Sequence, residues 1–360
     1  MNSKINRARK KILLIGVIVL AAVLLSSLQT PSSAAQVSPG GTHEVVDETG
    51  RRVAVPVTVR RMVSLAPSLT ETLYALEAQD RLVGVTDYCD YPPEARTKPR
   101  VGGMRNPSFE AILAQKPDLV FGTTAINRLE TVQALERLGI PVYATDPRSV
   151  AGVLVSIRHI AELIGASAQG EALTAHLETQ LAELRQRLTG SVPKRALFVV
   201  WEDPLISIGP HTFLADALRL GGAESVVQAA QDWPQVSLEE VVRLQPEYLV
   251  FASADASSGA KQAEELQRRP VWRDLSAVRR HHVAIVSDAI DSPAPRMIAA
   301  VEQLARELHP EAFTKDSESR KEKMENRQEP GTGRARASSS PFPFSLFQIL
   351  SSPEPCLCSR

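Results

Sequence analysis

The chain has 360 residues, of which 43% are hydrophobic, and its formal net charge at pH 7 is zero. No basic run lies in its central part, so the sequence gives no electrostatic support for nucleic-acid binding. About 280 residues lie between two ends of unusual composition, which is enough for two domains of ordinary size.

Residues 1–35 have the order of a secretory signal peptide. A basic start is followed by an apolar stretch at 12–25 and then by small polar residues, with cleavage expected after Ala34 or Ala35. The apolar stretch is shorter than the roughly 20 residues of a spanning helix, so an uncleaved membrane anchor is the second interpretation. No lipobox cysteine lies near the cleavage site, so we expect export without a lipid anchor.

The opposite end, residues 315–360, is charged and then rich in Ser and Pro, and it cannot bury enough apolar surface to order itself. We predict a disordered tail. Cys356 and Cys358 could be a metal or redox pair, although two cysteines at a chain end are a weak signal. Cys89 is the one cysteine in the predicted fold, where we expect a free buried thiol.

The first half alternates strand and helix patterns. A β-hairpin is predicted at 44–59, and apolar runs predict strands at 61–65, 82–85, 119–121 and 142–144. Ser68 and Glu71 have capping-box spacing for a helix that runs to Leu76, and a further helix is predicted at 128–138. This alternation indicates an N-terminal α/β lobe, residues 42–165, with a mainly parallel sheet.

Two helices are predicted in the middle, at 150–164 and 169–188. The second has leucines at 173, 177, 181, 184 and 188, which share one face. We assign 166–190 to a single long connecting helix, which would permit small rocking of the lobes rather than a wide hinge.

The second half, residues 194–312, repeats the alternation and predicts a C-terminal α/β lobe. Its strands are expected at 196–200 and 283–286, and its helices at 212–220, 262–268 and 295–308.

A helix–strand cassette occurs in both halves, starting at Ser108 and at Ser237. Each serine is a candidate N-cap, a proline ends each helix nine residues later, and an apolar strand follows. Glu110 and Glu239 occupy the same place in the first turn. There they either stabilise the helix end by about 0.3–1 kcal/mol or offer matched contacts on two lobes.

No dinucleotide fingerprint, P-loop or nucleophile elbow appears in the expected context. Large side chains instead follow strands or precede helices, where α/β sheets place ligand sites. These candidates are Tyr88, Tyr91, Met104, Trp201 and Trp233. Aromatic surfaces from two lobes suit a large planar ligand better than a small ion, although ordinary loop packing would also account for each residue.

Five strings carry a family resemblance: VSLAPSLTE at 63–71, VGVTDYCDYPP at 83–93, KPDLV at 116–120, WPQVS at 233–237 and SPAPR at 292–296. Over residues 61–310 the chain resembles the periplasmic substrate-binding proteins of ABC importers for vitamin B12 and iron chelates, and within them the cobalamin-binding branch. The resemblance implies two Rossmann-like lobes joined by a helix, a periplasmic monomer without a cofactor, and no enzymatic activity.

The resemblance also implies roles for individual residues. Tyr88 and Trp233 match aromatics that contact the corrin ring, and Asp288 matches a polar contact residue. Glu110 and Glu239 match glutamates that such proteins offer to arginines of the membrane permease. Two positions depart from the pattern: Met104 stands where a tryptophan can be, and Ser292 where a ligand-contacting arginine can be.

We therefore expect a corrinoid between the lobes and an ABC permease as partner. Compared with an arginine, Ser292 lacks a charge and several hydrogen-bond donors. A receptor for haem or for a ferric siderophore is therefore an alternative interpretation. An exported metal-binding protein or α/β enzyme is the alternative from a different class.

Overall fold

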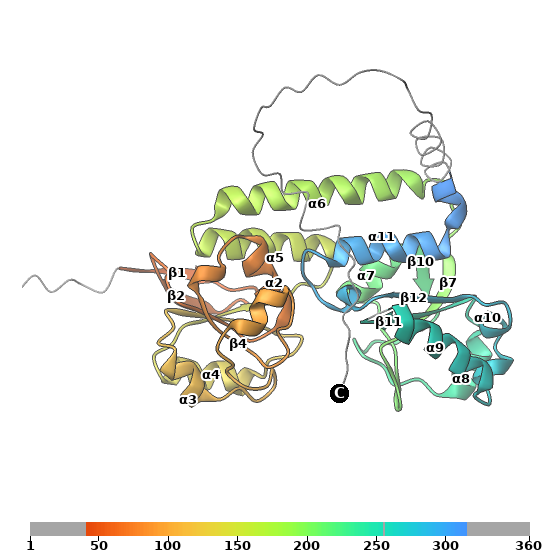
Figure 1. The fold of residues 1–360 in the computed structure, drawn as a ribbon, viewed down its shortest axis with the longest axis horizontal. Coiled ribbons are helices and arrows are strands. Elements are labelled where there is room, and N and C mark those ends of the chain that lie inside the picture. Colours follow the sequence, from red (N-terminus) through yellow and green to blue (C-terminus); the bar gives the residue numbers. More distant parts are fainter. Residues whose placement is uncertain (1–40, 255, 315–360) are drawn as a thin grey trace, which may run out of the picture. The chain divides into compact units, whose positions relative to one another are not determined.

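The computed structural model describes residues 41–254 and 256–314 (Figure 1). The predicted signal peptide at 1–35 and the predicted tail at 315–360, with Cys356 and Cys358, lie outside the described residues. In the described part of the chain, no helix is both long and apolar enough to cross a membrane.

The predicted hairpin is confirmed, with β1 (Thr42–Val46) antiparallel to β2 (Arg52–Pro56). A four-stranded parallel sheet follows in the order β4-β3-β5-β6. Its strands are β3 (Met62–Ser64), β4 (Leu82–Val85), β5 (Leu119–Thr123) and β6 (Val142–Thr145). Their side chains are almost all buried, as expected of a parallel sheet covered on both faces.

The helices around this sheet are α2 (Pro67–Ala75), α3 (Phe109–Ala114), α4 (Leu129–Arg137) and α5 (Val150–Leu163), with 3-10 turns η1 (Gln79–Arg81) and η2 (Pro93–Thr97). We call the elements from β1 to α5 the N-lobe.

The capping-box prediction for α2 is wrong. The helix starts at Pro67, which suits a first helical position, and the N-cap is Ala66 without a side-chain bond. Ser68 and Glu71 are therefore buried inside the helix, and Glu71 is available for a contact elsewhere.

The connecting helix α6 (Ser167–Arg187) buries Leu177, Leu181 and Leu184 on the predicted face. It packs along α5, where Gly170 lies so close to Ala161 that an added Cβ would come within 2.4 Å of the alanine methyl. Because α6 also contacts α11, it lies against helices of both halves.

The second half contains a parallel sheet in the order β10-β7-β11-β12. Its strands are β7 (Lys194–Val199), β10 (Ala223–Ser225), β11 (Tyr248–Ser253) and β12 (Val283–Ser287). A small antiparallel hairpin that the sequence pattern did not predict, β8 (Trp201–Glu202) with β9 (Leu205–Ile206), follows β7.

The helices here are α7 (Phe213–Leu220), α8 (Leu238–Leu244), α9 (Ala256–Arg268), α10 (Ser276–Arg279) and α11 (Met297–Leu308), with 3-10 turns η3 (Trp272–Asp274), η4 (Asp288–Asp291) and η5 (Pro310–Phe313). We call the elements from β7 to α11 the C-lobe. With the small hairpin set aside, both lobes have the same strand order, second-first-third-fourth. The prediction of two α/β lobes with parallel sheets and one long joining helix is confirmed.

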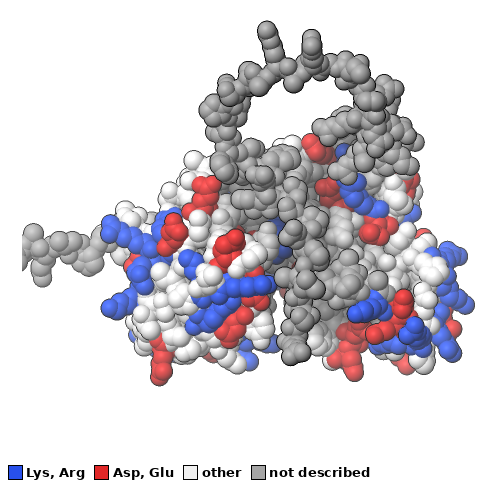
Figure 2. Space-filling model, viewed as in Figure 1, with Lys and Arg blue, Asp and Glu red and all other residues white. Residues whose placement is uncertain are grey.

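Charged side chains of both signs are interspersed over the face shown in Figure 2. This distribution agrees with the zero net charge of the chain.

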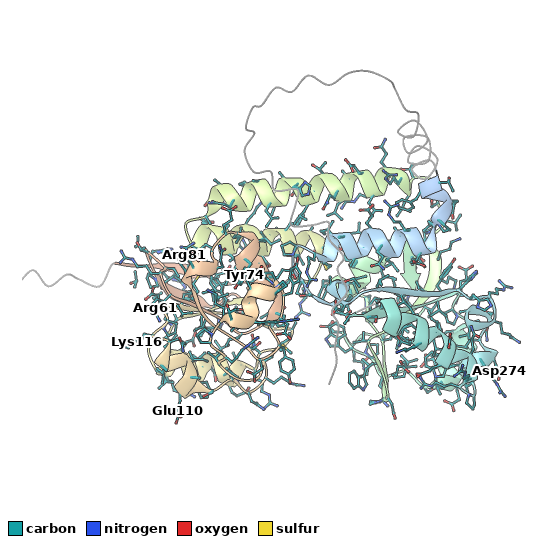
Figure 3. The ribbon with its side chains drawn as sticks, viewed as in Figure 1. Arg61, Tyr74, Arg81, Glu110, Lys116 and Asp274 are labelled. Atoms are coloured by element: carbon teal, nitrogen blue, oxygen red, sulfur yellow. The ribbon has the colours of Figure 1, made fainter. Side chains whose placement is uncertain are left out.

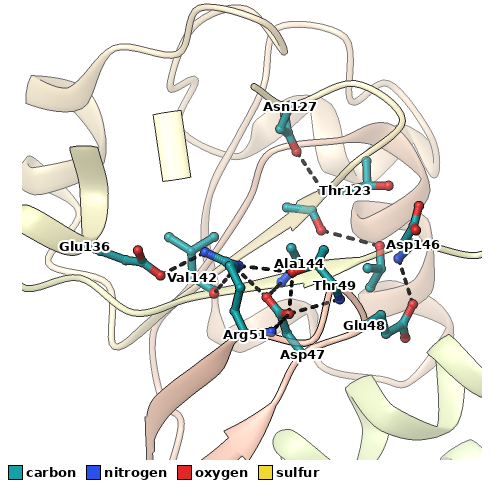
Figure 4. Close-up of polar contacts among 12 residues, drawn as sticks. Asp47, Glu48, Thr49, Arg51, Thr123, Asn127, Glu136, Val142, Ala144 and Asp146 are labelled. Carbon is teal, nitrogen blue, oxygen red and sulfur yellow. Dashed lines mark hydrogen bonds and ion pairs between the residues drawn. The ribbon is translucent and has the colours of Figure 1, made fainter. Parts of the chain in front are cut away.

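The turn of the first hairpin is held to the N-lobe sheet by Asp47 (Figure 4). One carboxylate oxygen accepts hydrogen bonds from Thr49 N, Thr49 Oγ1 and Arg51 N at 2.6–3.0 Å. The other is bonded by the Arg51 guanidinium and by Ala144 N of β6, and Arg51 also reaches Glu136 at 2.9 Å. Burial raises the pKa of Asp47, but these hydrogen bonds and the Arg51 charge outweigh it, so its pKa is lowered.

Asp47→Asn should lower the free energy of unfolding by about 1–3 kcal/mol at pH 7, because an amide nitrogen cannot accept the bonds that one carboxylate oxygen now receives. The lowered pKa means that Asp47 stabilises the fold above its unfolded pKa of about 3.9 and that this contribution is lost as the pH falls through the folded pKa. Urea unfolding at pH 7 and below pH 4 measures the difference, which should shrink in acid. Glu44→Gln, which removes an exposed pair with Arg52, is the matched control and should change little.

Candidate functional site

The two cassettes have the same local structure. Ser108 and Ser237 are N-caps as predicted, accepting from the backbone N–H of the third residue that follows at 3.2 and 3.1 Å. Eight residues after each serine the backbone turns into the left-handed region, with φ of 47° at Lys116 and 43° at Gln245. These matched turns end α3 and α8 directly before the prolines.

The same cassettes are tied to their sheets by equivalent contacts. The carboxylate of Asp118 accepts the backbone N–H of Arg61 at 2.8 Å, and that of Glu247 accepts the backbone N–H of Arg195 at 3.0 Å. Each arginine side chain donates to a carbonyl at the end of the cassette helix. The repeat therefore places α3 and α8 in equivalent positions on the two lobes.

Glu110 and Glu239 are exposed, and neither forms an ion pair with another described residue. The neighbouring Glu240, by contrast, pairs with Arg243 at 3.3 Å. Figure 3 shows Glu110 pointing away from the N-lobe at its tip. Both carboxylates are thus free to meet a cation from outside the molecule.

The lobes meet at a junction formed by Glu71, Arg296 and Tyr91. Glu71 of α2 accepts from Arg296 N at 2.8 Å and from Arg296 Nε at 2.9 Å, and its side chain is 5% exposed. The guanidinium carbon of Arg296 lies 3.3 Å from the centre of the Tyr91 ring, a cation–π contact. Burial raises the pKa of Glu71, and the charge and hydrogen bonds of Arg296 oppose that rise.

A reciprocal contact lies beside the junction. Arg296 is the N-cap residue of α11, so Glu71 of the N-lobe binds the start of a C-lobe helix. Asp216 of α7 in the C-lobe accepts the N–H of Val150, the first residue of α5, at 2.8 Å. Figure 1 shows α5 and α11 below α6 with these ends toward each other. Each carboxylate neutralises the positive end of a helix from the opposite lobe.

A pocket of about 100 Å³ lies between the lobes near these helix starts. Its polar or aromatic lining residues are Thr124, Asp146 and Arg148 from the N-lobe and Thr212, Phe213, Asp232 and Trp233 from the C-lobe. Most of them follow strands or precede helices, which is where α/β sheets place ligands.

Arg148 crosses this pocket. Its guanidinium binds Asp146 at 3.0 Å within the N-lobe and Asp232 at 2.6 Å on the C-lobe. The hydrogen bond to Asp146 is the main cause of a raised Arg148 pKa. The pocket wall therefore carries one cation that two carboxylates already hold.

The hairpin turn supports the N-lobe side of the pocket (Figure 4). Glu48 accepts the N–H of Asp146 at 2.8 Å and the hydroxyl of Ser156 at 2.7 Å, while its other oxygen lies 3.2 Å from His159 Nδ1. Glu48 thus fixes the position of the Asp146 backbone relative to α5.

Trp233 lines the pocket, and Pro293 beside Ser292 does so as well. The other predicted ligand residues lie outside its lining. Tyr88 and Trp201 are about 60% exposed, and the Trp201 indole donates to Asp203 O at 2.8 Å. Their roles stay predictions.

Tyr91 lies at the junction, under Arg296. The Met104 carbonyl accepts from the Asn127 side chain at 2.8 Å. Asp288 is exposed at the start of η4, close enough to Glu71 to raise its pKa through charge.

Sequence reasoning missed Thr124, Asp146, Arg148, Thr212 and Asp232. Thr124 and Asp146 directly follow the last residues of β5 and β6, so polar residues after adjacent parallel strands were a usable signal. Arg148 and Asp232 had no such signal, because their contact joins residues 84 positions apart.

The sequence model of the periplasmic binding protein family matches residues 62–289 of this chain, so the chain belongs to this family. An uncharacterized ABC transporter substrate-binding lipoprotein of Bacillus subtilis is 29% identical over 82% of this chain and 96% of its own length. The crystal structure of the periplasmic vitamin B12 binding protein of Vibrio cholerae is 28% identical, covers 69% of this chain and 96% of that one, and has a TM-score of 0.61. The periplasmic heme-binding protein of Roseiflexus is 26% identical, with 70% and 99% coverage and a TM-score of 0.63.

The chain is thus a periplasmic binding protein of the ABC importer class and not an enzyme. What such a protein carries is cargo rather than a cofactor. Among the described residues, no group of three or more His, Cys, Asp or Glu side chains is placed to hold a metal ion, and Cys89 is a buried free thiol as expected.

Arg296→Met should lower the free energy of unfolding by about 1–3 kcal/mol at pH 7, because it leaves the buried Glu71 carboxylate without its cation. In the variant, the pKa of Glu71 in the folded protein rises further above its value in the unfolded chain. A carboxyl group with such a raised pKa destabilises the folded state increasingly as the pH rises from the unfolded pKa to the folded pKa. The loss measured by urea unfolding should therefore be larger at pH 7 than at pH 5. Arg243→Met, which frees only the exposed Glu240, serves as control; an equal loss in both variants would contradict the role of the junction.

Proposed function

We propose that this chain is an exported receptor that binds a corrinoid between its lobes and delivers it to an ABC permease. The observation that carries the proposal is the pocket between the lobes, with Trp233 on one wall and polar groups from both. A vitamin B12 binder is among its structural relatives at 28% identity, and a haem binder is similar at 26%, so the chemistry of the pocket must distinguish the ligands.

That chemistry favours a corrinoid. The lining offers carboxylates of Asp146 and Asp232 and hydroxyls of Thr124 and Thr212, which accept hydrogen bonds. A corrinoid carries peripheral amides, whose N–H groups donate such bonds. A haem or an anionic siderophore carries groups that need cations, and the lining holds two carboxylates against the single cation of Arg148.

Binding requires the pocket to widen. Its 100 Å³ is below the roughly 300–1,000 Å³ of ordinary ligand pockets, so the lobes must separate at this point. The contact to be broken there, Arg148 with Asp232, is partly exposed, and pairs of this kind contribute only about 0–1 kcal/mol. The contact of the buried Glu71 carboxylate with Arg296 need not break, so we infer a rocking motion about the junction.

The remaining predicted ligand residues, Tyr88, Tyr91, Met104, Trp201, Asp288 and Ser292, are proposed to contact the corrinoid around the widened pocket. Their support is the position of the segments that carry them, after strands or near the junction. A haem or ferric-siderophore receptor is the second candidate.

Titration of the purified chain with cyanocobalamin should show micromolar or tighter binding by calorimetry. Trp233→Ala should weaken it about tenfold, because the ring supplies apolar contact area in the pocket. Leu138→Ala, an exposed change outside the pocket, is the control and should leave the affinity unchanged. Haem and a ferric siderophore are titrated in parallel, and tight binding of either without cobalamin binding would replace the corrinoid with that ligand.

We further propose that Glu110 and Glu239 dock the loaded protein on cations of the permease. Reversing both charges, Glu110→Arg with Glu239→Arg, should reduce cobalamin uptake into proteoliposomes at least about tenfold through like-charge repulsion. Cobalamin affinity should stay the same, since both residues lie outside the pocket.

Glu240→Arg is the matched control for this reversal, because Glu240 is adjacent, exposed and already paired with Arg243. Cobalamin uptake with this variant should remain near that with the unaltered protein. Loss of cobalamin affinity in the double variant would contradict the separation of ligand binding from docking.

A further inference from the structure

We propose that Leu113 and Val242 form the apolar half of the docking surface, each beside one of the two glutamates. The proposal rests on the delivery function above and names further residues for it. Its occupant is the permease, through two surface segments that each present a cation next to an apolar side chain.

The two residues occupy the same position in the two cassettes. Leu113 lies five residues after Ser108, Val242 lies five residues after Ser237, and their exposed fractions are 41% and 40%. Each lies three residues after a glutamate, so Glu110 with Leu113 and Glu239 with Val242 share a helix face.

The orientation of both faces is set by the buried residue that precedes each apolar one. Ile112 is 0% exposed and Val241 is 1% exposed, so each helix has one side fixed in its lobe. The next residue, Leu113 or Val242, is consequently directed toward solvent.

Two other positions of these helices differ between the lobes. Three residues after the serine the N-lobe has Ala111 and the C-lobe Glu240, and six residues after it they have Ala114 and Arg243. A single exposed apolar residue on a soluble protein needs no explanation. An exposed acidic residue and an exposed apolar residue that recur together on both lobes indicate a shared partner.

The chemistry of the pair identifies the kind of partner. A glutamate that meets an arginine in water gains little, whereas excluding water beside the pair strengthens the bond. Leu113 and Val242 can provide this by packing on the apolar stem of the incoming arginine or on its neighbour. Figure 1 shows α3 and α8 on the side of the molecule away from α6, so one partner can contact both.

The test uses the purified chain and the cobalamin permease complex of the same organism in nanodiscs, with affinity measured by biolayer interferometry. Leu113→Ser and Val242→Ser should each weaken binding about five- to tenfold, and the double variant by about the product, because the sites lie on separate lobes. Leu113→Met and Val242→Ile should retain binding. Val155→Ser, an equally exposed change on helix α5, is the matched control and should have no effect.

Circular dichroism and cobalamin titration confirm that each variant is folded and binds ligand as before. If the double serine variant binds the permease as tightly as the unaltered chain while the glutamate reversals lose binding, docking is purely ionic and the inference is overturned. If the unaltered chain itself does not bind the permease, the proposed delivery function fails, and the inference with it.

Discussion

The structure depends on the way two helix starts are held where the lobes meet. The N-terminal ends of α5 and α11 point toward each other, and two positive helix ends repel. Glu71 from the N-lobe and Asp216 from the C-lobe each bind the helix of the other lobe, so each lobe supplies the charge that its partner lacks. The lobes are therefore joined by more than the connecting helix α6.

This contact between the lobes brings together in space sequence strings that lie far apart along the chain. Glu71, Tyr91 and Arg296 come from three of the five strings that carry the family resemblance, and they form one contact. The pocket lies next to that contact, because the loop before α5, the start of α7 and the segment before α11 all end there. A ligand in the proposed site would therefore touch segments that also form the contact between the lobes.

Local patterns predicted most elements of the fold, since apolar runs, serine N-caps and prolines act over a few residues. The repeated cassette was predicted down to its caps at Ser108 and Ser237. Glu71 was misread, because its spacing from Ser68 imitates a capping box whereas its partner lies 225 positions away. Of the predicted ligand residues only Trp233 lines the pocket, since a wall built from two lobes depends on distant pairs such as Arg148 with Asp232.

The exposure of the Arg148–Asp232 bridge has a consequence for the conditions in which the protein works. Salt screens charges in contact with water far more than charges shielded by protein. Raising the ionic strength would weaken this bridge more than the pair of Glu71 and Arg296, whose carboxylate is only 5% exposed. The mouth of the pocket is therefore more responsive to the surrounding medium than the junction about which we propose that the lobes rock.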